Sequence, residues 1–180
     1  MNRRSVAILA AVAAIVCLCA SGVLAQDNEE VAAITARVHG TFVDKAGGLG
    51  VLSADMSIIR FEVRNGTVTA IGRIEGALAD STGDVLGKVK KELALPVAGV
   101  ASTCNQLRMD LAATDADILD TPVHFDREVA GFDSRDGARP KALGALCAAA
   151  RLLQEKPAVD SVARALNDIA IAVKNEATRR

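Results

Sequence analysis

The sequence has almost no aromatic residues: among 180 residues there is no Trp, no Tyr and only four Phe. It also lacks an excess of basic charge, because 21 Lys and Arg stand against 22 Asp and Glu, for a net charge of −1. Surfaces that bind nucleic acids combine basic clusters with aromatic side chains on which bases stack. We therefore expect no nucleic-acid partner.

Residues that carry catalysis are also scarce. The chain has only two histidines, His39 and His124, and no Gly-x-Ser-x-Gly motif for a nucleophilic serine. Both histidines fall at outward positions of expected strands. His124, with Asp126 or Glu128 nearby, has the residue types of a general base, so a small hydrolase is one alternative function. Because exposed strand histidines usually have no catalytic role, we expect no catalytic residues, no cofactor and no enzymatic activity.

An acidic stretch follows Leu111, with Asp115, Asp117 and Asp120. Carboxylate oxygens are the ligands that Ca²⁺ prefers, and Asp110 lies close enough in sequence to join them. The stretch lacks the Asp-x-Asp-x-Asp-Gly order of a calcium loop. We therefore expect a solvated polar loop from Asp115 to Asp120 and no metal site.

The N-terminus has the layout of a secretory signal peptide. The basic pair Arg3-Arg4 precedes an apolar run from Val6 to Ala20, and Val23-Leu24-Ala25 fits a cleavage site before Gln26. An uncleaved membrane anchor is the alternative, but the run is shorter than the roughly 20 residues that a span needs. The prediction is a signal peptide over residues 1–25, an exported protein in the periplasm or outside the cell, and no membrane span after cleavage.

Two of the four cysteines lie within that signal peptide, so the mature chain keeps Cys104 and Cys147. An even pair of cysteines in an exported protein indicates a disulfide bond. Two buried free thiols are the alternative. Cleavage also removes two arginines and leaves 19 basic and 22 acidic residues, a net charge of −3.

Alternation of apolar and polar residues predicts several strands. The first runs from Ile34 to Phe42, the second from about Leu52 to Val63, and the third from about Thr67 to Leu78. A slip of the alternation at Ile58-Ile59 predicts a bulge. Asn65-Gly66 predicts a tight hairpin turn, because a type I′ turn needs positive φ at both central residues.

The next strands are less regular. Val85, Gly87 and Val89 predict a weak edge strand guarded by lysines, which Pro96 interrupts. A central strand then starts near Val100 and carries Leu107, Met109 and Leu111 on one face. Two further short strands are expected at 123–125 and 129–132.

Two helices are expected at the C-terminus. Pro140 suits the first turn of a helix that ends before Pro157, with Leu143, Leu146, Cys147, Ala150 and Leu153 on one face. The second helix has the most regular apolar period in the chain, made by Val159, Val162, Ala163, Leu166, Ile169, Ala170 and Val173. We expect this apolar face to cover the protein's own sheet; pairing with another chain is the alternative.

These elements predict a mainly β (α+β) protein. Its antiparallel sheet of six to eight strands is expected to be strongly curved or barrel-like, with the C-terminal helices packed on it. The expected organisation is a signal peptide (1–25), a flexible lead-in (26–33), a β-rich domain with the disulfide and the following helix (34–155), and an amphipathic helix packed on that domain (156–180).

Several short motifs also carry a family resemblance. They are Gly40-Thr41-Phe42, Ile58-x-x-Phe61, Asn65-Gly66, Ala70-Ile71-Gly72, Leu95-Pro96-Val97, Thr103-Cys104-Asn105-Gln106-Leu107, Val123-His124-Phe125 and Ala142-Leu143-Gly144-Ala145-Leu146-Cys147. With these glycine-containing strands and the C-x-x-L…L-G-x-L-C cysteine pair, the chain resembles a family of secreted bacterial proteins without an established function. The resemblance covers about Val38 to Leu153 and departs at 112–117, where relatives are rich in Leu, Gly and Pro. It implies secretion but no activity and no catalytic residues.

The resulting expectation is an exported, non-catalytic envelope or extracellular protein that binds another macromolecule or has a structural role. The first alternative is a carrier of a small apolar ligand, because Gly72 and Gly76 on an apolar strand face leave room inside a barrel-like sheet. The expected partner is accordingly an envelope protein or a small apolar ligand.

Overall fold

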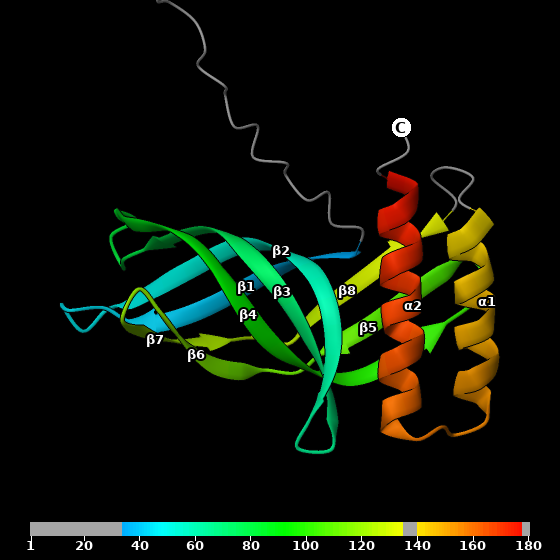
Figure 1. Ribbon diagram of the computed structural model, residues 1–180. Helices are drawn as coiled ribbons and strands as arrows, with labels where there is room; N and C mark the ends of the chain where they lie inside the picture. The colour runs from blue at the N-terminus through cyan, green and yellow to red at the C-terminus, as the bar shows by residue number, and fades with distance from the viewer. Residues whose placement is uncertain (1–33, 135–139, 178–180) are drawn as a thin grey trace, which may run out of the picture. The chain divides into compact units, whose positions relative to one another are not determined.

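The computed structural model of the chain describes residues 34–134 and 140–177. The predicted signal peptide (1–25) and lead-in (26–33) lie outside these residues. The described residues form eight β-strands followed by two α-helices (Figure 1). Their bounds are β1 Ile34–Val43, β2 Leu49–Arg64, β3 Thr67–Ala79, β4 Val85–Ser102, β5 Gln106–Leu111, β6 Thr114–Ile118, β7 Thr121–Phe125, β8 Glu128–Asp133, α1 Pro140–Gln154 and α2 Val159–Ala177.

All strands belong to one antiparallel sheet that closes on itself. Its order is β2-β3-β4-β5-β8-β1-β7-β6, and β2 also pairs with β1, which joins the two sides into a ring. β1 pairs with β2 along its whole length and meets both β8 and β7 on its other side. The prediction of a mainly β fold with a strongly curved, barrel-like antiparallel sheet is thus confirmed.

The long hairpin of β2 and β3 has the two predicted irregularities. The register of their pairing shifts between Ile58 and Arg60, which confirms the bulge. Asn65 and Gly66 have φ angles of 50° and 73° and form the tight turn between the strands, as predicted.

The prediction that Pro96 interrupts the fourth strand is wrong. β4 runs unbroken through this residue for 18 residues and pairs with β3 as far as Thr69 opposite Pro96. The Pro96 carbonyl accepts the Ala112 N–H at 2.8 Å, so this residue's polar backbone atoms face the β5 side. The pairing of β4 with β5 ends at Val97 opposite Leu111. Proline has no backbone N–H, and its absence at Pro96 therefore costs no hydrogen bond between these strands.

The predicted polar loop from Asp115 to Asp120 is also wrong. This segment forms the hairpin of β6 and β7, and Asp115 and Asp117 lie on exposed positions of β6. Leu119 and Asp120 make the turn with φ angles of 50° and 60°. The hairpin has an apolar inner side, since Ile118, Val123 and Phe125 are fully buried in the core. That burial outweighs the low strand propensity of the aspartates.

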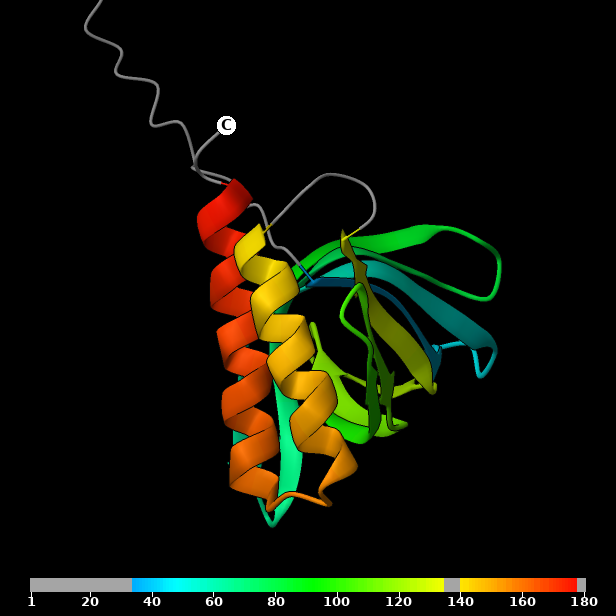
Figure 2. The same ribbon diagram turned by 90° about the vertical axis from the view of Figure 1, so that its right-hand side faces the viewer.

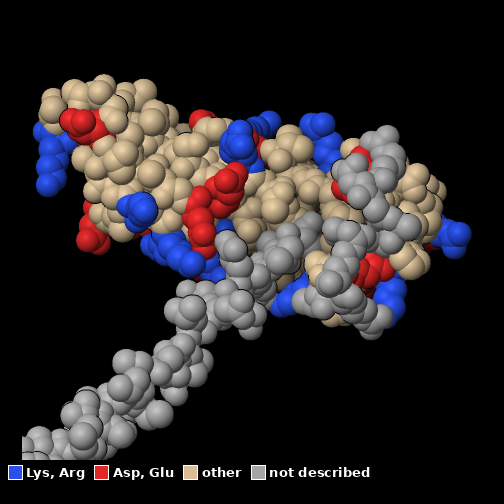
Figure 3. Space-filling view, turned by 90° about the horizontal axis from the view of Figure 1, so that it is seen from above, with Lys and Arg blue, Asp and Glu red and all other residues tan. Residues whose placement is uncertain are grey.

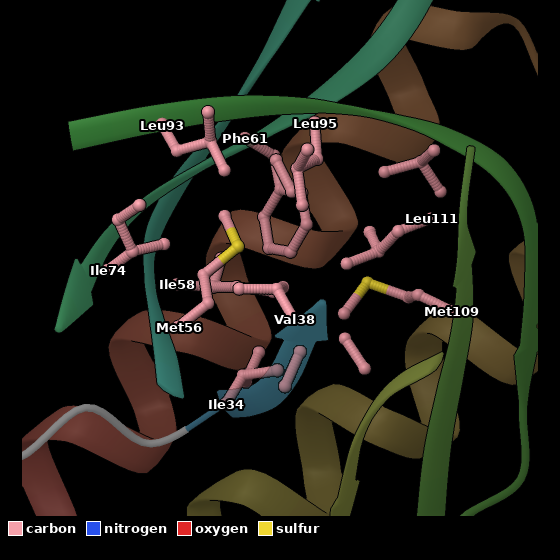
Figure 4. Packing of buried hydrophobic residues seen from close by; sticks show 14 of the residues in the cluster. Ile34, Val38, Met56, Ile58, Phe61, Ile74, Leu93, Leu95, Met109 and Leu111 are labelled. Carbon is pink, nitrogen blue, oxygen red and sulfur yellow. The ribbon is translucent and has the colours of Figure 1, made fainter. Parts of the chain in front are cut away.

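The interior of the ring is filled by side chains. Figure 4 shows Val38, Phe61, Leu95 and Met109 pointing inward from four different strands. The largest fully buried side chains are Phe125, Ile34, Leu52, Met56, Ile71, Ile74, Leu78, Leu95, Leu107, Met109, Leu111 and Ile118.

Gly72 and Gly76 do not leave space for a ligand inside the ring, as the carrier alternative expected. A Cβ at Gly72 would lie 2.7 Å from the Met56 Cε atom, and a Cβ at Gly76 would lie 2.6 Å from the Ala54 Cα atom. Both glycines therefore permit a close approach of β3 to β2, which strong curvature requires. The space beside each is already occupied by β2.

The helices lie side by side at one end of the ring (Figure 2), α2 against β2 and β3 and α1 against β4. The prediction that α2 covers the protein's own sheet is confirmed: its buried residues are Ala163, Leu166, Ile169, Ala170 and Val173. The expected face of α1 is partly wrong. Its buried residues are Ala142, Leu146 and Ala149, while Leu143 and Leu153 are half-buried. Alanines on the buried side let α1 approach the sheet closely.

One side chain of α2 completes an unpaired strand edge. β1 pairs with β2 only as far as Ile58. Among the described residues, the segment of β2 after Ile58 therefore has no partner strand on that side. The Asn167 side chain donates to the Phe61 carbonyl and accepts the Phe61 N–H, both at 2.8 Å. This amide thus makes the two hydrogen bonds of a neighbouring strand and holds α2 in place.

Candidate interaction surface

The two histidines lie on the outer face of neighbouring strands, as predicted, and each contacts a carboxylate. The His39 Nδ1 atom lies 2.6 Å from Glu128 Oε1, and the same oxygen accepts the His39 backbone N–H at 3.2 Å. The backbone of β1 meets both β7 and β8 near this point. The Glu128 carboxylate therefore acts as the acceptor that the interrupted ladder does not provide.

The hydrolase alternative required a contact of His124 with Asp126 or Glu128, and His124 contacts neither of them. Its Nδ1 atom lies 2.8 Å from Asp115 Oδ1, directly across the β6–β7 hairpin. Both histidine side chains are about half exposed, at 51% and 53%. Among the described residues no group of three or more His, Cys, Asp or Glu side chains is placed to hold a metal ion. Each contact joins two strands: His39 of β1 to Glu128 of β8, and His124 of β7 to Asp115 of β6.

Cys104 and Cys147 form a disulfide bond, as predicted. Cys147 lies on α1, as predicted, and its sulfur is bonded to that of Cys104 at 2.04 Å. Cys104 lies in the turn between β4 and β5, two positions before the first residue of β5, whereas the sequence pattern placed it on a strand. Hydrogen bonds from Asn105 and Gln106 to the Thr103 Oγ1 atom fix that turn. The bridge thus ties α1 to a rigid corner of the sheet.

Three hairpin turns lie together at the end of the ring away from the helices (Figure 1): residues 44–48 between β1 and β2, 80–84 between β3 and β4, and 119–120 between β6 and β7. Asp44 connects the first two turns. Its Oδ1 atom accepts the N–H groups of Ala46 and Gly48, and its Oδ2 atom accepts the N–H and hydroxyl of Ser81. One carboxylate therefore fixes both turns relative to each other.

These hydrogen bonds favour the ionised form of Asp44. The Ser81 hydroxyl and N–H, together with the Gly48 N–H, lower the pKa of Asp44 to about 2. Hydrogen bonds from the Thr82 side chain and the Asp84 N–H likewise lower the pKa of Asp80. Both turns consequently carry full negative charges at neutral pH.

The same end of the ring has an unusual number of exposed large apolar side chains. Val43 is 71% exposed and Val85 is 68% exposed, and Figure 3 shows a broad uncharged surface at this end, interrupted by single charged side chains. We name this surface the turn rim; it consists of Val43, Leu49, Val51, Val85, Leu86 and Leu119. Its members are neighbours: Val43 pairs with Leu49, while Val51 and Val85 both pair with Ala79 between them.

Leu119 is the most unusual residue of the turn rim. It is 54% exposed and has a φ of 50°, in the left-handed region that bulky side chains rarely adopt. A Cβ at Gly87 would lie 2.9 Å from the Leu119 Cδ1 atom, so the leucine side chain lies over β4. The chain therefore keeps a strained backbone to present an apolar side chain to solvent, a combination that is concentrated at functional sites.

Acidic residues surround the turn rim. The three turns contain four aspartates, Asp44, Asp80, Asp84 and Asp120, and one basic residue, Lys45. The surface that results is an apolar centre with an acidic border.

The outer face nearer the helices is different, because oppositely charged residues pair there. Arg60 contacts Glu62 at 2.7 Å and Glu92 at 3.2 Å, and Arg64 contacts Glu62 at 2.8 Å. Hydrogen bonds from Arg64 and Arg60 lower the pKa of Glu62, and those to Glu62 and Glu92 raise the pKa of Arg60. The charges of this face are paired with one another, whereas the turn rim consists of apolar side chains.

The sequence did not reveal the turn rim. Val43 and Leu49 lay outside the strands predicted at Ile34–Phe42 and Leu52–Val63, and Leu119 lay in a stretch expected to be a polar loop. A usable signal was present, because Val43 and Leu49 flank the turn at 44–48, and Val85 and Leu86 directly follow the turn at 80–84. The hairpins of β1 to β4 bring five of these residues together, and the β6–β7 turn adds Leu119.

The chain matches no known protein family, no curated protein and no solved structure. Neither helix of the described part of the chain combines the length and the hydrophobicity that crossing a membrane requires.

Proposed function

We propose that this chain is an exported, non-catalytic binding module of the cell envelope or extracellular space, and that it recognises another macromolecule with the turn rim. The observation that carries the proposal is the turn rim itself. Exposed aliphatic side chains gather there on turns that Asp44 holds together. Contiguous exposed apolar surface on a rigid support is typical of protein interaction sites.

Export is supported by the disulfide between Cys104 and Cys147 and by the sequence of residues 1–25. Disulfides persist in oxidising compartments outside the cytosol. The proposal includes membership of the secreted bacterial family whose motifs the sequence resembles. N-terminal sequencing of the exported protein tests this part: the mature chain should begin at Gln26, and an intact Met1 on membrane-bound protein would contradict it.

The two alternative functions have less support. The argument for a carrier of an apolar ligand used Gly72 and Gly76, and Met56 and the β2 backbone occupy the space beside these glycines. The argument for a hydrolase used His124 with Asp126 or Glu128, and the contact of His124 is with Asp115 instead.

Site-specific photo-crosslinking in the native host tests the proposed function. A photoreactive residue at Leu119 should form a crosslinked adduct of one defined mass. The matched control is Ile171, which is similarly exposed (57%) but lies on α2, at the helix end of the ring. Absence of an adduct at Leu119, or equal adducts at both positions, would contradict the proposal.

A further inference from the structure

We infer that the partner of the turn rim is a protein surface with an apolar centre and a border of Lys and Arg side chains; this rests on the proposed function of the turn rim. The inference concerns the chemistry of the partner, and it follows from the charges around the rim and from the rigidity of the three turns.

The apolar part of the site is preorganised. The Ser81 hydroxyl and the Gly48 N–H both donate to Asp44, which fixes two of the turns. The third turn is held against β4, because the Leu119 side chain lies over Gly87 and the Lys91 Nζ atom donates to the Asp117 carbonyl at 2.7 Å. A surface that is rigid before binding loses little conformational entropy when a partner docks.

The charged part of the site selects the partner. Asp44, Asp80, Asp84 and Asp120 outnumber Lys45 in the three turns, which gives these turns a net charge of −3. Charges at the border of an interface mainly set the rate of association and the choice of partner, while the buried apolar centre holds the complex together. A border of Lys and Arg is complementary to these aspartates.

The same charges disfavour two other occupants. A second copy of this chain would place one acidic border against another, and like charges brought together across an interface lower affinity. A membrane with anionic lipids would repel the same aspartates.

Two synthetic amphipathic helices are suitable probes. Both have about 18 residues and the same leucine face, and their polar positions are all Lys in one and all Glu in the other. Stopped-flow fluorescence with the mature protein measures their association rates at low and high salt. We expect the Lys peptide to associate about tenfold faster at low salt, and the difference to shrink as salt screens the charges.

Variants separate the charged contribution from the apolar one. The double variant Asp84→Asn, Asp120→Asn should remove most of the preference for the Lys peptide, whereas Asp168→Asn on α2 should leave it intact. Asn suits the positive φ of position 120, and the backbone N–H of Asp84, which donates to Asp80, is retained.

The double variant Val85→Thr, Leu119→Asn should weaken binding of both peptides. Val63→Thr, near the end of β2 that lies away from the turn rim, should not weaken it. Asn at 119 also relieves the left-handed strain, so loss of binding would not come from loss of folding.

The outcomes distinguish the turn rim as the binding site from the basic border of its partner. Equal association of both peptides that still depends on Val85 and Leu119 would overturn the basic partner and keep the turn rim as the binding site. Peptide binding that does not depend on Val85 and Leu119 would overturn the turn rim itself. Self-association of the mature protein in sedimentation velocity, or binding to phosphatidylglycerol vesicles, that is lost in the Val85→Thr, Leu119→Asn variant would replace the basic protein with a second copy or a lipid surface.

Discussion

Loss of the Cys104–Cys147 bond should remove a large share of the stability of the fold. The two cysteines are 43 residues apart, so the bond closes a segment of 44 residues in the unfolded chain. The loop-entropy relation gives about 4 kcal/mol for a segment of this length. That is a substantial part of the roughly 5–15 kcal/mol by which a domain is stable. At 2–4 °C per kcal/mol, the melting temperature should fall by about 10 °C.

The cysteine variants should all lose the same amount of stability. Cys104→Ser, Cys147→Ser and the double variant should lose equal stability, because each breaks the same bond. Calorimetry of protein purified without reductant measures this, and reductant should lower the melting temperature of the wild type alone. Unequal losses, or two reactive thiols per unfolded chain without reductant, would refute the reasoning.

Three further changes test the packing described above. Asn167→Ala should cost about 2–4 kcal/mol in denaturant unfolding, because it leaves the Phe61 N–H and carbonyl without partners at a part-buried site; a cost below 1 kcal/mol would contradict that role. Gly76→Ala should destabilise by about 1–3 kcal/mol through overlap with the β2 backbone, whereas Gly144→Ala, with open space at its Cβ, should be neutral or stabilise; equal effects would contradict the close approach. Asp44 has its pKa lowered to about 2, so its hydrogen bonds stabilise the turns above about pH 4 and are lost as the pH falls toward 2; hydrogen exchange of the turn amides should show this transition, and Asp44→Asn should abolish it.

The sequence predicts those parts of the fold that depend on local pattern. Strict alternation in β1 gives burial at every second residue from Ile34 to Phe42. Thr41, which pairs with His124 of β7, is half-buried where the pattern predicts an exposed residue. Asn65-Gly66 specifies its turn because both residues tolerate positive φ. The buried face of α2 follows from the helical period of its apolar residues.

Features that depend on neighbours in space were not predictable. Whether Pro96 breaks β4 is decided by where β5 ends, and no local pattern contains that information. The β6–β7 hairpin turns at Leu119-Asp120, a dipeptide with no glycine or asparagine to indicate a type I′ turn. The Cys104–Cys147 pair was predictable because only two cysteines remain after the predicted cleavage.

The most direct test of the turn rim is a chemical-shift map of the isotopically labelled protein with the Lys-containing amphipathic peptide. Amide shifts should concentrate in residues 44–48, 80–84 and 119–120 and should be absent along α1 and α2. Shifts centred on the helices, or on the face that carries His39 and His124, would place recognition elsewhere and contradict the account.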